Sequence, residues 1–200
     1  MRRVVFVFLL VGFWGVSFAQ ADVPTDHHYR SVVNLLTSKR GFPTRKQMLR
    51  TGLGSTTVRI LSGIAADTKK RPRLRLNAAR ALEYFPTRDT EKFLGSVLYG
   101  RFWKPAFKSA AMRVMARGFG AKMYFEFLPF LRDSDPHLRA GAALALGDLT
   151  DPRVLNNLQN HLSHEKELSV RVAIEKAMDR YRKRERARRQ KKEAAQHRSN

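Results

Sequence analysis

Residues 135–152 read DPHLRAGAALALGDLTDP, and this stretch decides the fold of the chain. Apolar residues recur in it at intervals of three and four, which is the spacing of one face of an α-helix. Proline fits the first turn of a helix, because the backbone N–H that it lacks would be unpaired there. The stretch therefore predicts a helix that begins at about Pro136, with Asp135 as its N-cap.

The same pattern recurs along the chain at a nearly constant interval. Basic anchor residues stand at Arg75, Lys108, Arg139 and Arg171, which gives steps of 33, 31 and 32 residues. Apolar residues follow each anchor at fixed offsets, and a proline precedes each of the first three by three positions. A period of this length holds two short helices and their turns, which is the unit of a helical solenoid.

A second helix should follow each of the first three anchor segments. The apolar spacing favours second helices at residues 87–98, 121–131 and 152–162, an upstream pair at 44–53 and 55–66, and a capping helix at 29–38. We expect Pro129 to kink the second of these helices, and Asp151 and Pro152 to begin the third. Left-handed C-caps are expected at three turn glycines, Gly118, Gly120 and Gly147.

These repeats resemble the HEAT-repeat family, in particular its short-repeat branch named for the phycobilisome lyases. Residues 135–152 match that branch almost throughout, and the looser resemblance of the other repeats extends over residues 44–179. The resemblance implies an all-α, right-handed superhelical solenoid of stacked antiparallel helix pairs, with about four to five repeats. Members of the family serve mostly as scaffolds and adaptors, so the resemblance implies a protein partner.

The N-terminal residues predict export. Arg2 and Arg3 precede a short apolar run, and Ala19-Gln20-Ala21 supplies a small-x-small cleavage pattern. This arrangement is typical of a secretory signal peptide, with an uncleaved membrane anchor as the alternative. The protein is then periplasmic or secreted. The expected organisation is a signal peptide at 1–21, an N-terminal capping segment at 22–43, HEAT-like repeats at 44–179 and a basic solvated tail at 180–200.

The formal net charge of +22 is concentrated partly in the tail, which carries ten basic residues against two glutamates. Such a run favours a polyanion as partner: lipopolysaccharide, an anionic lipid or a nucleic acid. A purely solubilising tail is the alternative. Like charges four residues apart oppose helix formation, so we expect a frayed extension of the last helix. The candidate polyanion-binding residues are Arg180, Arg184, Arg188, Arg189, Lys191 and Lys192.

Catalytic patterns are absent from the sequence. The chain has no cysteine, and therefore no thiolate nucleophile, thiol metal ligand or disulfide. His164-Glu165 is interpreted as a surface dipeptide, and His27-His28 as adjacent histidines without a metal role. We therefore expect no enzyme activity, no cofactor, no metal and no small-molecule substrate.

The predicted function is a non-catalytic exported scaffold, monomeric, that binds a protein partner through its concave face. In solenoids the second helices commonly line that face. The candidate contact residues are Arg88, Lys92, Lys122, Arg153, Asn157 and Asn160. Two aromatic stretches, 102–103 and 123–127, are expected to fill gaps between stacked helices rather than to form a binding surface. A polyanion-binding envelope protein that acts through its tail is the alternative function.

Overall fold

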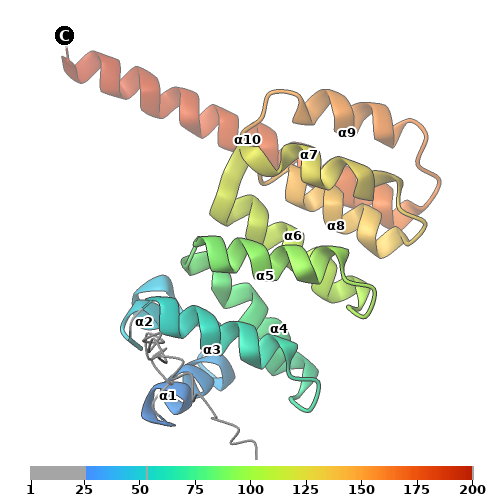
Figure 1. Ribbon diagram of the computed structural model, residues 1–200. Coiled ribbons are helices and arrows are strands. Elements are labelled where there is room, and N and C mark those ends of the chain that lie inside the picture. Colours follow the sequence, from blue (N-terminus) through green and yellow to red (C-terminus); the bar gives the residue numbers. More distant parts are fainter. Residues whose placement is uncertain (1–25, 53, 200) are drawn as a thin grey trace, which may run out of the picture.

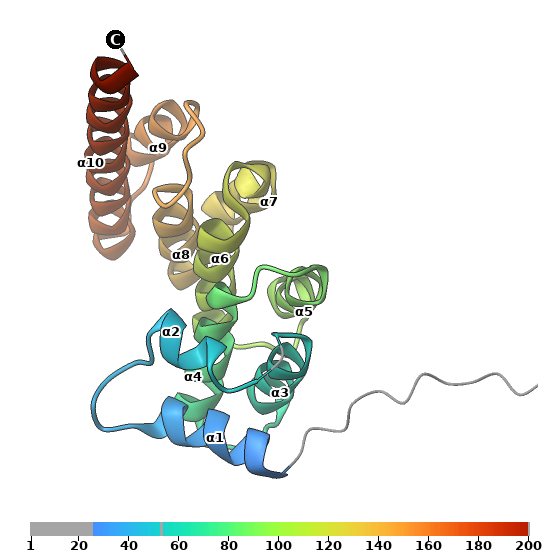
Figure 2. The same cartoon turned by 90° about the vertical axis from the view of Figure 1, so that its left-hand side faces the viewer.

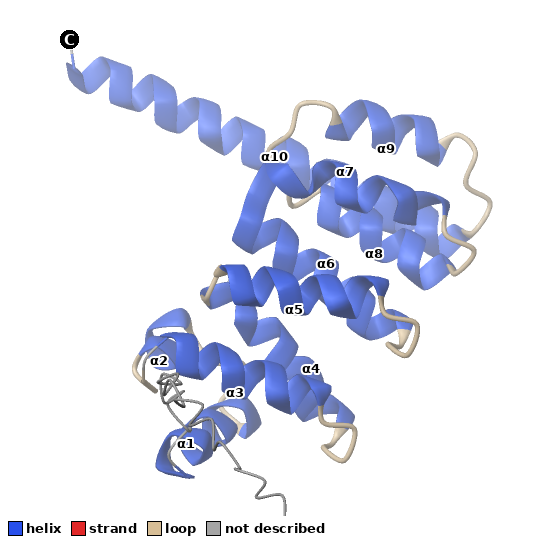
Figure 3. Cartoon of the chain, viewed as in Figure 1, coloured by secondary structure: helices blue, strands red, loops and turns tan. Residues whose placement is uncertain are grey.

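The described part of the chain is a stack of helices in two layers, as a computed structural model shows for residues 26–52 and 54–199 (Figure 1). These residues contain no strand (Figure 3). The first helices of the repeats are α4 (Pro72–Ala81), α6 (Pro105–Phe119), α8 (Pro136–Leu146) and α10 (Leu168–Ser199). They pack side by side in one layer (Figure 2). This arrangement confirms the predicted all-α solenoid.

The other layer contains the second helices. These are α3 (Gly54–Ala66), α5 (Arg88–Tyr99), a broken segment made of η2 (Gly120–Met123), α7 (Tyr124–Phe127) and η3 (Leu128–Arg132), and α9 (Val154–Leu162). At the N-terminal end, α1 (Asp26–Thr37) packs on α3 and α4, and the short α2 (Arg45–Leu49) adjoins α1 and the 3-10 turn η1 (Leu82–Tyr84). Each second helix packs on the first helix that follows it in the chain.

Proline begins three of the first helices, as the sequence predicts. Pro72, Pro105 and Pro136 each lie in the first turn of their helix. Asp135 caps α8, because its carboxylate accepts a hydrogen bond of 2.8 Å from the backbone N–H of His137. These local signals fix where each first helix starts, and the rest of the repeat register follows from them.

Small residues let the first helices approach closely. Ala78, Ala111 and Ala142 stand at the same offset after their anchors and are fully buried between the layers. At Gly147 two backbones approach closely: a Cβ built there would lie 2.5 Å from the carbonyl oxygen of Ala177 and 2.7 Å from its Cα. Gly141 likewise faces Ser109 of α6, with 2.4 Å from an added Cβ to Oγ.

The predicted left-handed caps are correct at one of the three turn glycines. Gly120 has φ of 67° and follows the end of α6. Gly147 has a right-handed φ of −62°, so contact with α10, not backbone freedom, requires glycine there. The prediction that Gly118 lies in a turn is wrong. Gly118 lies in the last turn of α6, which continues to Phe119.

Two second helices differ from their predictions. The segment around Pro129 is not a single kinked helix but three short helical turns, because proline cannot donate the hydrogen bond that a continuous helix needs. Helix α9 begins at Val154, two residues later than predicted. Asp151 instead accepts a hydrogen bond of 2.9 Å from the backbone N–H of Arg153, which holds residues 151–153 as a turn.

Helix α10 continues well beyond its packed half. Residues Leu168 to Tyr181 include the buried face that packs on α8, and nearly all side chains from Arg182 to Gln196 are exposed. The extension is helical where a frayed segment was predicted (Figure 1). The packed half supplies the helix nucleus, and the extension contains neither glycine nor proline. These two factors outweigh the repulsion between neighbouring arginines.

Candidate partner-binding groove

Two of the basic anchor residues donate hydrogen bonds to backbone carbonyls at or just after the end of the preceding helix. Arg75 donates from Nε to the carbonyl of Ala65, at 2.9 Å. Arg171 donates from Nη1 to the carbonyls of Leu162 and Glu165, both at 3.0 Å. Because Ala65 and Leu162 lie in the last turns of α3 and α9, these arginines satisfy carbonyls that have no partner within the helix. At these two repeats the anchor is therefore structural.

The third anchor, Arg139, forms a two-point ion pair with Glu165. The distances are 2.8 Å from Nε to Oε2 and 3.0 Å from Nη2 to Oε1, and the two side chains are 17% and 5% exposed. Hydrogen bonding from Arg139 is the main cause that lowers the pKa of Glu165 to about 2. The interpretation of His164-Glu165 as a surface dipeptide is therefore wrong for Glu165, although His164 is exposed.

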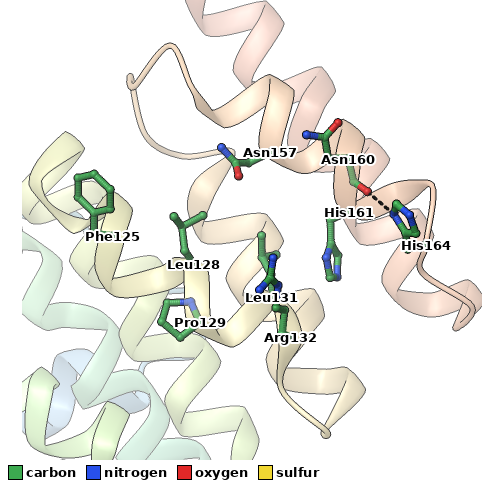
Figure 4. A pocket seen from close by; sticks show the side chains of 9 residues that line it. All are labelled: Phe125, Leu128, Pro129, Leu131, Arg132, Asn157, Asn160, His161 and His164. Atoms are coloured by element: carbon green, nitrogen blue, oxygen red, sulfur yellow. Dashed lines mark hydrogen bonds between the residues drawn. The ribbon is translucent and has the colours of Figure 1, made fainter.

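A hollow of about 940 Å³ lies beside this ion pair, between η3 and α9 (Figure 4). We call it the groove. Its lining residues come from α7 and η3 on one side and from α9 and the following turn on the other: Phe125, Leu128, Pro129, Leu131, Arg132, Asn157, Asn160, His161 and His164. His161 connects the groove to the ion pair, with Nε2 3.4 Å from Oε2 of Glu165.

The groove combines an apolar floor with hydrogen-bonding groups and positive charge. Phe125 is 65% exposed, so the expectation that residues 123–127 are all core is wrong at this position. Arg132, Asn160 and His164 are exposed, and the lining contains no carboxylate. The groove thus offers donors and a cation next to apolar surface.

Arg153 adjoins the groove through its contact with Phe125. Its guanidinium carbon lies 4.3 Å from the ring centroid of Tyr124 and 4.6 Å from that of Phe125. Asp151 orients it through an ion pair of 2.7 Å. Asn157 donates to the hydroxyl of Tyr124, which is buried. These contacts hold Arg153 and Asn157 in fixed positions at the rim.

The six predicted partner-contact residues all lie in the layer of second helices or at its turns. Asn157 and Asn160 line the groove, and Arg153 adjoins it. Arg88 and Lys92 are exposed on α5, away from the groove. Lys122, on η2, is paired with Glu91 at 2.9 Å. The structure therefore brings together three of the six.

Sequence reasoning missed several groove residues, among them Phe125, Arg132 and His161. One available signal was Pro129 within a second helix, since a broken helix leaves part of the facing surface uncovered. Phe102, of the other aromatic stretch, is 93% exposed, whereas Trp103 packs against Phe93 and Phe107.

The six candidate polyanion-binding residues are exposed along one continuous helix, α10. Arg184 is partly neutralised, because it lies 3.3 Å from the carboxylate of Asp148. Arg188 lies 3.7 Å from Glu185. Arg184 therefore contacts the repeats, whereas Arg188 pairs within its own helix, α10.

Two further findings concern the described residues as a whole. Within 26–52 and 54–199, no three His, Asp or Glu side chains lie close enough together to hold a metal ion. Over the same ranges, every helix is too short or too polar to cross a membrane. The predicted signal peptide, residues 1–21, lies outside the described residues.

Comparison with known proteins identifies the repeat type. A family model described as HEAT repeats matches residues 103–179, which hold α6 to α9, the packed half of α10 and the whole groove. No curated protein matches this chain. The match, together with the stacked helix pairs, supports HEAT repeats over this part of the chain.

Proposed function

We propose that this protein is an exported, non-catalytic scaffold that binds a segment of a protein partner in the groove. The observation that carries the proposal is the exposed Phe125 above an apolar floor, next to hydrogen-bonding groups held in place by other contacts. Exposed aromatic residues and arginines are enriched at protein interfaces. HEAT repeats serve mainly in protein interactions, which supports a scaffold role. The groove belongs to the layer of second helices, the face that the sequence predicts to be concave.

The chemistry of the groove selects the kind of segment that it would bind. Phe125 and the half-buried Leu128 offer apolar surface for one inserted side chain, and the exposed Arg132 supplies positive charge beside it. The absence of carboxylates from the lining favours acidic groups on the partner. The preferred segment therefore has an apolar anchor residue flanked by Asp or Glu.

Arg153→Ala should weaken binding of the partner captured from envelope extract at least tenfold, because it removes a rim cation and exposes the ring of Tyr124. Arg88→Ala is the matched control, since it removes an exposed arginine of the same layer outside the groove. Affinity would be measured by calorimetry with the purified partner. Equal losses in both variants would show that the groove is not the site.

Export and the lack of catalysis belong to the same proposal. The charged start, short apolar run and Ala-x-Ala pattern support cleavage after Ala21. The mature chain should then begin at Asp22, which the intact mass of the exported protein measures. Retention of Met1 on a membrane-bound species would contradict this. The absence of cysteine and the usual scaffold role of HEAT-repeat proteins support a non-catalytic protein. We also propose that the protein is a monomer and that its repeats are of the short type.

Polyanion binding through the tail is the second candidate function. The observation in its favour is the exposure of Arg188, Arg189, Lys191 and Lys192 on a helix that projects from the stack (Figure 1). Binding of DNA or lipopolysaccharide by this segment would fall steeply with salt. Replacement of these four residues by glutamine tests it, because binding that persists would exclude the tail as the main element.

A further inference from the structure

A second charged cluster lies on the layer of first helices, away from the groove and mostly outside the tail. In the repeat register, five of its members stand either five or nine residues after an anchor. Arg80 and Arg113 stand at offset five, and Arg117, Asp148 and Arg180 stand at offset nine. Positions four residues apart share one helix face, and the first helices pack side by side. The two offsets therefore place charges on α4, α6 and α10 and in the turn after α8, and we call this cluster the arginine ladder.

Two carboxylates hold two of the arginines of this ladder. Nη1 of Arg117 lies 3.1 Å from Oε2 of Glu83, and Nε of Arg117 lies 3.1 Å from Oδ2 of Asp148. Asp148, whose side chain is only 3% exposed, also lies 3.3 Å from Nη2 of Arg184, and its backbone carbonyl accepts from the same guanidinium. Asp148 is thus shared by arginines from α6 and α10.

The remaining arginines have no acidic partner among the described residues. These are Arg80, Arg113 and Arg180, and Nε of Arg113 is buried without a hydrogen-bond partner. Burial is the main cause that lowers the pKa of Arg113, and the charges of Arg117, Arg180 and Arg80 lower it further, against the opposing effect of Asp148. The cluster therefore contains five arginines, Arg184 included, and two carboxylates that are already paired.

We propose that this arginine ladder is a binding site for a phosphate group. Five arginines against two carboxylates leave a formal charge of +3, which a phosphate monoester of charge about −1.5 to −2 would offset in large part. The guanidinium fork matches phosphate oxygens in a two-point geometry, and a tetrahedral anion accepts from several guanidiniums at once. Arg80, Arg113 and Arg180, which have no acidic partner among the described residues, are the arginines whose guanidiniums such an anion would pair.

Calorimetric titration of the mature full-length protein with inorganic phosphate, at constant ionic strength, tests the site. Arg113→Gln and Arg180→Gln should each lower the affinity for phosphate at least tenfold. Arg59→Gln, which removes an exposed arginine of α3, should change it less than twofold. Phosphate should also raise the midpoint of thermal unfolding of the parent protein, and this rise should be lost in Arg113→Gln.

Two further arms identify the source of the phosphate group and exclude the tail. Vesicles of phosphatidylcholine with phosphatidic acid replace free phosphate in the first. Binding that depends on Arg113 would show a lipid headgroup as ligand, and binding of free phosphate alone would show a small molecule. In the second arm, the variant with Arg188, Arg189, Lys191 and Lys192 replaced by glutamine should keep its phosphate affinity.

The proposal is overturned if phosphate produces no saturable binding and the vesicles with phosphatidic acid do not bind through Arg113. It is also overturned if Arg59→Gln weakens binding as much as Arg113→Gln, because the attraction would then be a diffuse effect of net charge. Circular dichroism of each variant confirms that loss of binding is not loss of fold. None of these outcomes depends on a protein partner in the groove.

Discussion

Replacement of Glu165 by alanine should lower the free energy of unfolding by about 3–5 kcal/mol, because it leaves a largely buried arginine without its carboxylate. Arg139 is only 17% exposed and makes two short contacts with Glu165. Denaturant unfolding followed by circular dichroism would measure the loss. The matched control is Glu175→Ala, which removes an exposed carboxylate of α10 and should change stability by less than about 0.5 kcal/mol.

The pH dependence of the same ion pair gives an independent measurement. The pKa of Glu165 is lowered to about 2, and its value in the unfolded chain is about 4.3. A lowered carboxyl pKa stabilises the fold above the unfolded value, and this contribution is lost as the pH falls from about 4.3 to about 2. The Glu165→Ala variant should therefore lose less stability over this interval than the parent protein. Identical acid unfolding curves would show that the ion pair contributes little.

Replacement of Gly147 by alanine should destabilise the protein by about 3 kcal/mol, which is at the upper end of ordinary overpacking effects. The added Cβ would lie 2.5 Å and 2.7 Å from backbone atoms of Ala177, which cannot rotate away as a side chain can. Helix α10 would have to move away from α8, and its packed half would lose contact along its length. Unfolding midpoints would measure the effect.

Gly63→Ala is the matched control for this prediction. Gly63 lies within α3 with no atom within 4 Å of an added Cβ. Alanine is favoured over glycine in a helix interior, so this variant should gain up to about 1 kcal/mol. Similar stability changes in the two variants would contradict close packing at Gly147 as the reason for glycine there.

The helices that the sequence predicts well are those that carry local start signals. Pro136 with Asp135 marks the start of α8, and Pro72 and Pro105 mark α4 and α6. The start of α9 was predicted two residues too early, because Asp151 and Pro152 form a turn that resembles a helix start in sequence. Helical periodicity and local caps thus determine most of the fold, within the usual uncertainty at helix ends.

Tertiary contacts explain what sequence reasoning missed. Gly147 has the sequence context of a helix cap, yet its role comes from Ala177, thirty residues later. Glu165 belongs to a His-Glu dipeptide that suggests a surface position, yet it lies under Arg139 of the preceding repeat. The arginine ladder follows from the repeat register at offsets of five and nine, but its missing counter-charges are apparent only once the helices are side by side.

The continuity of α10 has a mechanical consequence. Its residues 180–199 would span about 30 Å at 1.5 Å per residue, and no glycine or proline interrupts them as a hinge. The projecting half cannot swing independently of the half that packs on α8. A molecule held near its tip would stand at a set distance and angle from the repeats, and a force applied there would be transmitted as torque to the α8–α10 contact at Gly147.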